Sequence, residues 1–264
     1  MDMCFLKETK NYKNYKLFFF LYFHINKILN SFWIHEGYLH IFYVPLFKKK
    51  RNYEKIIAYL KEKGIKKVCI NHITDDFLIE KIKETFKVFE GEPLFYYYFE
   101  KIIDKFMKKN AFLYEESEIA FISDEPEQVK KYIEKVVKKF KKVSIFSKKK
   151  EHFINLAEEC LKMYGTTLFL KDEKEQPKKQ KRIYVNLENK TIFSKNFFKN
   201  VSIIDIFHIY ENSFNEVLFK IPFSEELILK KEKISKNLCF LEYLSEKSKE
   251  SLQTEYKIVN IKKI

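Results

Sequence analysis

Between residues 118 and 170, short apolar runs alternate with longer segments whose apolar residues recur with helical period. The runs at 119–122, 143–146 and 166–170 are rich in branched and aromatic residues, a composition typical of strands. The segment after the first run carries a wide apolar stripe on one helical face, formed by Val129, Ile133, Val136, Val137 and Phe140. This β-α-β-α-β order predicts a parallel sheet with right-handed crossovers.

The same alternation extends the predicted sheet toward the N-terminal part of the chain. Strands are expected at 39–44 and 65–70, and a helix capped by Thr74 and Asp75 follows the second of them. The predicted fold class is therefore α/β, with a doubly wound, mostly parallel Rossmann-like sheet over residues 38–187.

Two further regions flank this predicted domain. Residues 1–37 form an apolar and aromatic segment, and residues 188–264 are expected to fold as a smaller mixed α+β region. In the latter, Ser202 and Asp205 resemble a capping box, which predicts a helix to about residue 210. A strand is expected at 216–221 and mainly helix at 224–254.

The scarcity of glycine excludes one large class of nucleotide sites. The chain has four glycines, at Gly37, Gly64, Gly91 and Gly165, and they are far apart. Neither of the glycine-rich phosphate-binding motifs, G-x-G-x-x-G and G-x-x-x-x-G-K-[ST], can be formed from isolated glycines. A nucleotide-dependent enzyme would therefore need a different kind of phosphate-binding turn.

The net charge of +14 comes almost entirely from lysine, because Arg51 and Arg182 are the two arginines. Sequence-specific readers of nucleic acid use arginine for bidentate contacts to guanine, so no specific nucleic-acid partner is expected. A diffuse attraction to nucleic acid or to anionic membrane surfaces remains an alternative. The lysine clusters at 48–51, 138–142 and 148–150 are expected to be solvated.

The cysteines and the N-terminal segment point to a reducing cytoplasm. The four cysteines are far apart and form no C-x-x-C pair, so neither a disulfide framework nor a metal site is expected. The apolar run at 17–23 is followed directly by polar and basic residues and lacks a cleavage site of small residues. It is expected to be a buried element or an interfacial helix, which leaves peripheral membrane contact open. A bacterial cytoplasmic protein is the resulting expectation.

The predicted strands end in polar residues that could carry chemistry. In open α/β sheets, ligands bind outside the carboxyl ends of the strands. His72 and Asp75 are the candidate catalytic residues, because a histidine beside carboxylates can act as a general base. Ser123 and Ser147 with Lys148 and Lys149 are the candidate cofactor-binding residues. The serines and Asp75 are equally the residues that cap helices.

Residues 143–159 read Val-Ser-Ile-Phe-Ser-Lys-Lys-Lys-Glu-His-Phe-Ile-Asn-Leu-Ala-Glu-Glu. Within 118–170, this stretch resembles the NADP-binding module of shikimate dehydrogenase-like and glutamyl-tRNA reductase-like proteins. The resemblance implies a Rossmann-like fold in which Ser147, Lys148 and Lys149 contact the 2′-phosphate of NADP. The chain departs from that family at the first turn, where Ile-Ser-Asp-Glu-Pro at 122–126 replaces the glycine-rich sequence and sets two carboxylates against a diphosphate.

Three functions follow as hypotheses. The leading one is a non-catalytic or regulatory binding protein on a Rossmann-like scaffold, whose partner is a protein or a small ligand. The alternative is a divergent NADP-dependent oxidoreductase or nucleotide-binding enzyme that uses the candidate residues named above. The second alternative is a lysine-rich binder of nucleic acid or membrane surfaces.

Overall fold

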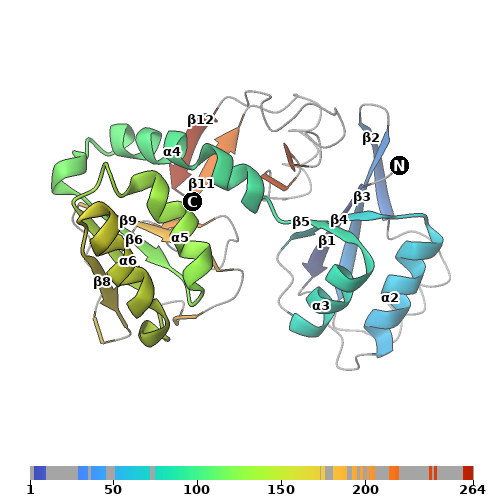
Figure 1. Ribbon diagram of the computed structural model, residues 1–264. Coiled ribbons are helices and arrows are strands. Elements are labelled where there is room, and N and C mark those ends of the chain that lie inside the picture. Colours follow the sequence, from blue (N-terminus) through green and yellow to red (C-terminus); the bar gives the residue numbers. More distant parts are fainter. Residues whose placement is uncertain are drawn as a thin grey trace. The chain divides into compact units, whose positions relative to one another are not determined.

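The computed structural model divides the chain into two compact units, each made of two separate stretches of sequence (Figure 1). Unit 1 comprises Met1–Gly91 and Ile221–Thr254, and unit 2 comprises Glu92–Lys220 and Glu255–Ile264. The structure describes residues 3–9, 29–34, 37–45, 51–71, 75–172, 174–175, 181–188, 192–194, 197–198, 201, 203–205, 214–219, 238–239, 241–242 and 258–263.

This division differs from the boundaries expected at residues 37 and 187. The strands expected near residues 40 and 67 belong to the sheet of unit 1, whereas those expected from residue 119 onward belong to the sheet of unit 2. Composition gave no sign of the boundary, because Gly91 is followed directly by the first helix of unit 2. The βα alternation continues across that boundary, so it predicts the elements without separating the two sheets.

Unit 1 contains a five-stranded sheet. Its strands lie in the order β2 (Leu29–Ile34), β3 (Gly37–Pro45), β1 (Met3–Thr9), β4 (Lys67–Asn71) and β5 (Lys87–Phe89). Strand β1 pairs in parallel with both β3 and β4, and β2 forms an antiparallel hairpin with β3. The N-terminal segment thus supplies the central strand of this sheet.

Two helices of unit 1 bury the apolar faces that the sequence predicts. Helix α2 (Arg51–Glu62) buries Ile56, Ile57 and Leu60 in the core of the unit. Gly64 follows with a φ of +73°, the left-handed conformation that commonly ends helices. Helix α3 (Asp76–Thr85) begins after Asp75, whose Oδ1 accepts the backbone N–H of Leu78 at 3.0 Å.

Unit 2 contains a seven-stranded sheet. The order is β12 (Ile258–Lys263), β11 (Phe214–Phe219), β10 (Ile203–Asp205), β9 (Arg182–Asn186), β6 (Glu118–Ile122), β7 (Lys142–Phe146) and β8 (Leu168–Lys171). All neighbouring strands pair in parallel except β11 and β12, which are antiparallel. Counted along the chain within this unit, the six parallel strands lie in the order 3-2-1-4-5-6, which is the doubly wound Rossmann order. The α/β fold class predicted from the sequence is confirmed.

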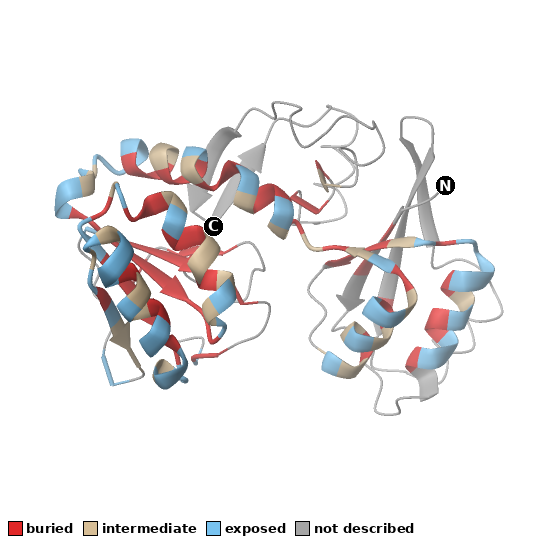
Figure 2. Ribbon diagram, viewed as in Figure 1, coloured by how far each residue is buried: buried red, intermediate tan, exposed pale blue. Residues whose placement is uncertain are grey.

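Helices cover this sheet as the apolar stripes predict. Figure 2 shows strands β6, β7 and β9 as almost entirely buried. Helix α5 (Pro126–Val136) buries Val129, Tyr132, Ile133 and Val136, and α6 (Ile154–Tyr164) buries Leu156 and Cys160. Helix α4 (Glu92–Lys109) contacts α5. The Tyr132 ring lies 4.8 Å from that of Phe99 on α4, in an edge-on contact.

A buried ion cluster lies on one face of this sheet. The Glu118 carboxylate accepts hydrogen bonds from Lys171 at 2.8 Å and from Arg182 and Ser144. The charged side chains of the cluster are 10–14% exposed. Burial alone would raise the pKa of Glu118, but the hydrogen bonds from Lys171 and Ser144 and the charge of Arg182 outweigh it and lower that pKa.

One predicted element is wrong, and others fall outside the described residues. Residues Ile203–Asp205 form strand β10 between β9 and β11, not the start of a helix. Of the stretch expected to be mainly helical at 224–254, the structure describes four residues, 238–239 and 241–242, and all four are helical. Among the described helices, none is both long enough and apolar enough to cross a membrane.

Candidate functional site

The strand order of unit 2 reverses between β6 and β9, and the carboxyl ends of these strands are where ligands bind in folds of this kind. Ile122 and Asn186, the last residues of the two strands, pair directly across this point. Buried polar side chains gather at these strand ends and in the turns beside them, and we call this group the switch-point cluster. Its members are Ser123, Asp124, Ser147, Asn186, Glu188 and Asp205, each at most 6% exposed.

Glu188 binds the turn that follows β6. Its Oε1 accepts the hydroxyl of Ser123 at 2.8 Å and the backbone N–H of Asp124 at 2.9 Å. The Ser123 hydroxyl oxygen also accepts the backbone N–H of Glu125 at 3.0 Å. The carboxylate thus takes up donors that a phosphate-binding turn would present to its ligand.

Asp124 links this turn to the loop after β7. Its Oδ1 accepts the hydroxyl of Ser147 at 2.7 Å and the backbone N–H of Lys148 at 2.9 Å. The backbone N–H of Lys149 in turn donates to the Ser147 hydroxyl oxygen at 2.9 Å. The ends of β6 and β7 are therefore joined by hydrogen bonds within the chain.

Asn186 holds Glu188 in place from β9. Its Nδ2 donates to the backbone carbonyl of Glu188 at 2.9 Å and to Asp205 Oδ1 at 2.8 Å. The backbone N–H of Glu188 donates to Asn186 Oδ1 at 3.2 Å. From α5, Gln128 Nε2 donates to the carbonyl of Leu187 at 2.6 Å. Both sides of the strand-order reversal are thus fixed by amide side chains.

The switch-point cluster consists of hydrogen bonds within the chain that join the ends of its strands. It contains the three carboxylates of Asp124, Glu188 and Asp205, and its partners are hydroxyl, amide and backbone N–H donors. Over the described part of the chain, no three His, Cys, Asp or Glu side chains are grouped so as to hold a metal ion. The arrangement therefore fixes the strand ends together and presents negative charge where a dinucleotide would place its own.

The structure brings together the four predicted cofactor-binding residues. Ser123 and Ser147 lie in the switch-point cluster, and Lys148 and Lys149 reach it through their backbone N–H groups while remaining exposed. Of the two predicted catalytic residues, Asp75 caps α3 in unit 1. His72 lies outside the described residues.

Glu188, Asn186 and Asp205 are cluster members that the sequence did not single out. Asn186 and Glu188 lie at the carboxyl end of strand β9, so the rule that ligands bind at strand ends could have included them. In the sequence, Asp205 fits the pattern of a helix capping box. Its position at the end of strand β10 is what brings it to Asn186.

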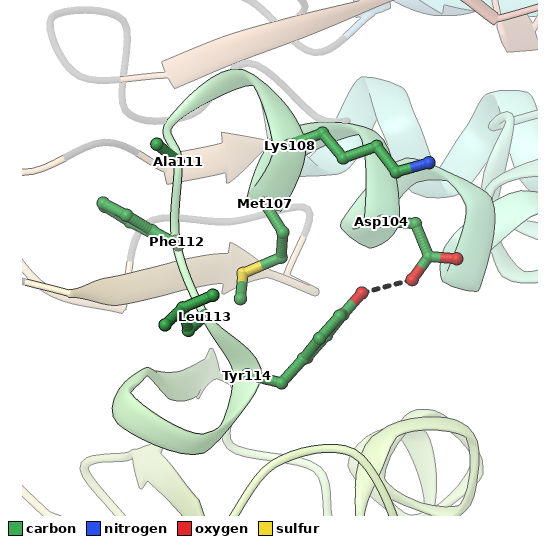
Figure 3. Close-up of a pocket in the computed structure, with 7 residues that line it drawn as sticks. All are labelled: Asp104, Met107, Lys108, Ala111, Phe112, Leu113 and Tyr114. Carbon is green, nitrogen blue, oxygen red and sulfur yellow. Dashed lines mark hydrogen bonds between the residues drawn. The ribbon is translucent and has the colours of Figure 1, made fainter.

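A hollow of about 460 Å³ lies elsewhere in unit 2, between the end of α4 and the short helix η1 (Tyr114–Glu116) (Figure 3). Met107, Phe112 and Leu113 give it a largely apolar lining. Its carboxylate, Asp104, accepts the Tyr114 hydroxyl and, at 3.2 Å, the Lys139 ammonium. Burial, and then Asp104, raise the pKa of Tyr114, so this hydroxyl stays protonated at neutral pH.

Comparison with known proteins yields structural matches alone. No family model matches the chain, and no curated protein does. Shikimate dehydrogenase 1 from Peptoclostridium difficile matches with 13% identity and a TM-score of 0.33, over 92% of this chain and 100% of that one. The 5-ketofructose reductase of Gluconobacter sp. strain CHM43, in its ligand-free form, matches with 7% identity and a TM-score of 0.31, over 80% and 83% of the two chains.

A third match is a chorismate mutase/shikimate 5-dehydrogenase fusion protein from Clostridium acetobutylicum, with 13% identity and a TM-score of 0.32. It covers 80% of this chain and 77% of that one. Two of these three proteins carry shikimate dehydrogenase in their names. Identities and TM-scores this low assign no activity, and the strand order alone establishes the fold.

Proposed function

We propose that this chain is a non-catalytic binding protein on a Rossmann-like scaffold. At the point where its strand order reverses, carboxylates of the chain itself accept the available hydrogen-bond donors, and no dinucleotide binds there. The observation that carries the proposal is the pair of hydrogen bonds from Ser123 and Asp124 to Glu188. They occupy the donors of the one turn at which a Rossmann-like domain places a pyrophosphate.

The energetics of that turn oppose a diphosphate. A bound pyrophosphate would have to displace Glu188 and then lie beside Asp124 and Glu125. The negative charges of the diphosphate and of these carboxylates would repel one another strongly in a buried setting. Pro126 has no backbone N–H that could donate to the diphosphate and offset this repulsion. Displacing Glu188 would also leave its buried carboxylate without the donors it has now, at a cost of roughly 1.5–3 kcal/mol per charged hydrogen bond.

A divergent NADP-dependent oxidoreductase is the second candidate. The observation that favours it is the exposure of Lys148 and Lys149 at the carboxyl end of β7, where the family that the sequence resembles contacts the 2′-phosphate. In this alternative the adenosine half would bind over the loop after β7, and the turn after β6 would rearrange.

Calorimetric titration of the purified full chain with NADPH, NADP⁺ and NAD⁺ separates the two candidates. The proposal predicts no saturable heat up to millimolar nucleotide, in the unaltered chain and in Lys148→Glu alike. Saturable NADPH binding that Lys148→Glu abolishes, with Lys162→Glu as the exposed control on α6, would overturn it. So would turnover of any NADPH-dependent reduction that is lost in His72→Ala.

Glu188 provides an independent check of the switch-point cluster. Glu188→Ala leaves the Ser123 hydroxyl and the Asp124 N–H buried without their partner, so we expect a loss of about 2–4 kcal/mol in the free energy of unfolding. Urea unfolding followed by circular dichroism measures it. Glu158, an exposed glutamate on α6, provides the control variant Glu158→Ala. An equal loss of stability in both variants would show that the hydrogen bonds to Glu188 do not stabilise the switch-point cluster.

A further inference from the structure

A second hollow in unit 2, of about 500 Å³, lies at the amino ends of β7 and β8, opposite to the carboxyl ends that carry the switch-point cluster. Its volume falls within the range of roughly 300–1,000 Å³ that is usual for ligand sites. We call it the basic hollow. The lining residues used below are Lys138, Lys141, Lys142, Thr166, Thr167 and Phe169.

Three lysines of the basic hollow form no ion pair within the described part of the chain. Lys138, Lys141 and Lys142 are exposed and form no ion pair with any described residue. By contrast, Lys139 in the same lining lies 3.2 Å from Asp104 and 3.4 Å from Glu100. Glu115 contributes one negative charge to the lining, which is fewer than the lysines contribute, so the charge around the hollow is positive on balance.

An exposed aromatic ring stands beside these lysines. Phe169 is 46% exposed and is the one phenylalanine among the large hydrophobic residues that the described part of the chain leaves exposed. It lies on β8, the edge strand at that end of the sheet order. Nearly half of this side chain is therefore accessible to a ligand, and Thr167 in the same lining adds a hydroxyl group.

We propose that the basic hollow binds single-stranded nucleic acid without sequence preference. Lysines that follow the phosphates and an aromatic ring on which a base stacks are the two parts from which such sites are built. A free base face is available in a single strand and not in a duplex, where the bases are already stacked. The lack of arginine at the hollow leaves no bidentate reader of base edges, so the binding is independent of sequence.

This inference supplies a partner for the proposed binding protein and rests on that proposal in one respect, that the chain acts by binding. The two sites lie at opposite ends of the strands, so each is tested by its own variants. Nucleotide titration addresses the switch-point cluster, and oligonucleotide titration addresses the basic hollow.

The test is fluorescence anisotropy of a labelled single-stranded oligothymidylate of about 15 nucleotides, titrated with the full chain at several salt concentrations. We expect saturable binding. The logarithm of the association constant should fall linearly with the logarithm of the salt concentration, with a slope near −2 for three lysine–phosphate contacts. The triple variant Lys138→Gln, Lys141→Gln, Lys142→Gln should bind at least tenfold more weakly and lose most of that slope.

A matched triple variant controls for net charge. Lys61→Gln, Lys63→Gln and Lys66→Gln removes three exposed lysines of unit 1 and should leave affinity and slope unchanged. Equal weakening by both triple variants would overturn the proposal, because the attraction would then belong to the whole charged surface. Absence of saturable binding by the unaltered chain overturns it as well.

The aromatic part has its own variants. Phe169→Leu keeps an apolar side chain but loses the ring, and we expect about a tenfold loss of affinity; Phe169→Trp should retain the affinity. Inorganic polyphosphate of equal charge should compete poorly. Equal competition by polyphosphate, or binding of vesicles containing anionic lipid in preference to the oligonucleotide, would contradict nucleic-acid recognition. All the altered side chains are exposed, and thermal unfolding of each variant confirms that it is folded.

Discussion

Glu118 shows how a single buried charge depends on its neighbours. Its carboxylate lies among Lys171, Arg182 and Ser144, and its folded-state pKa is held below the ordinary value of 4.5. A carboxyl whose pKa is lower in the folded than in the unfolded state binds protons more weakly when folded. Its contribution to stability is therefore complete above about pH 4.5 and is lost as the pH falls through the folded pKa.

The prediction that follows concerns Glu118→Gln. Removing the charge leaves Lys171 and Arg182 buried without their counter-ion, so we expect a loss of about 3–5 kcal/mol at pH 7. The difference between the variant and the unaltered chain should shrink as the pH falls below 4.5. Urea unfolding between pH 3 and pH 7 measures both effects, and a difference that stays constant with pH would refute this account of Glu118.

At the residue scale, the sequence predicted the candidate site in part. Ser123, Ser147 and Lys148 were found because they follow predicted strands, a local property. The contact between Glu188 and Ser123 could not be predicted, because it joins residues 65 positions apart and depends on β9 lying beside β6. Periodicity predicts the strands but not their order, so the partner of a turn stays hidden until the sheet is assembled.

At the scale of elements, three glycines share one backbone conformation and differ in their surroundings. Gly64, Gly91 and Gly165 have φ values of +73°, +79° and +65°. A Cβ on Gly91 would lie 2.7 Å from the Cβ of Leu238, whereas one on Gly64 would meet nothing within 4 Å. The N–H of Gly91 also donates to Glu242 at 2.8 Å, so this position fixes the end of β5 against a distant helical segment of the same unit.

Alanine at Gly91 and at Gly64 separates strain from crowding. Gly64→Ala should cost about 1–2 kcal/mol for the left-handed conformation alone. Gly91→Ala should cost a further 1–3 kcal/mol, because the new methyl group overlaps Leu238. Chemical unfolding of the two variants gives both values. Equal losses would show that Leu238 moves aside at no cost.

The elements themselves were predicted best where the pattern is local and long. Helix α5 and strands β6 and β7 lie close to where periodicity placed them, because each carries its own apolar face. Strand β10 was missed because three residues carry no period. Parallel pairing with β9 and β11 sets its conformation, and that pairing outweighs a capping pattern that is visible only locally.

At the scale of the whole molecule, the two units have separate hydrophobic cores, which lets them respond separately to substitution. We predict two unfolding transitions in calorimetry. Gly91→Ala should lower the midpoint of one, and Glu118→Gln that of the other, because these residues belong to different units. A single transition shifted by both variants would show that the units unfold as one cooperative body.

The βα pattern also explains why the sequence did not predict two sheets. Unit 1 and unit 2 both contain the repeated pattern of a strand followed by a helix, and lysine is abundant throughout the chain. The pairing partner of each strand decides which sheet it joins, and pairing is a long-range property. Fold class could thus be predicted from local pattern, whereas the division into units could not.

The interleaving of the two units has a consequence for synthesis on the ribosome. Residues 221–254 return to unit 1, and strand β12 then adds to the sheet of unit 2 beside β11. Translation proceeds at roughly 5–20 residues per second, and domains made of one continuous stretch can fold in turn as they emerge. Here unit 1 receives its last segment, residues 221–254, only after most of unit 2 has emerged. Unit 1 therefore begins first during translation but is completed only after most of unit 2 has been made.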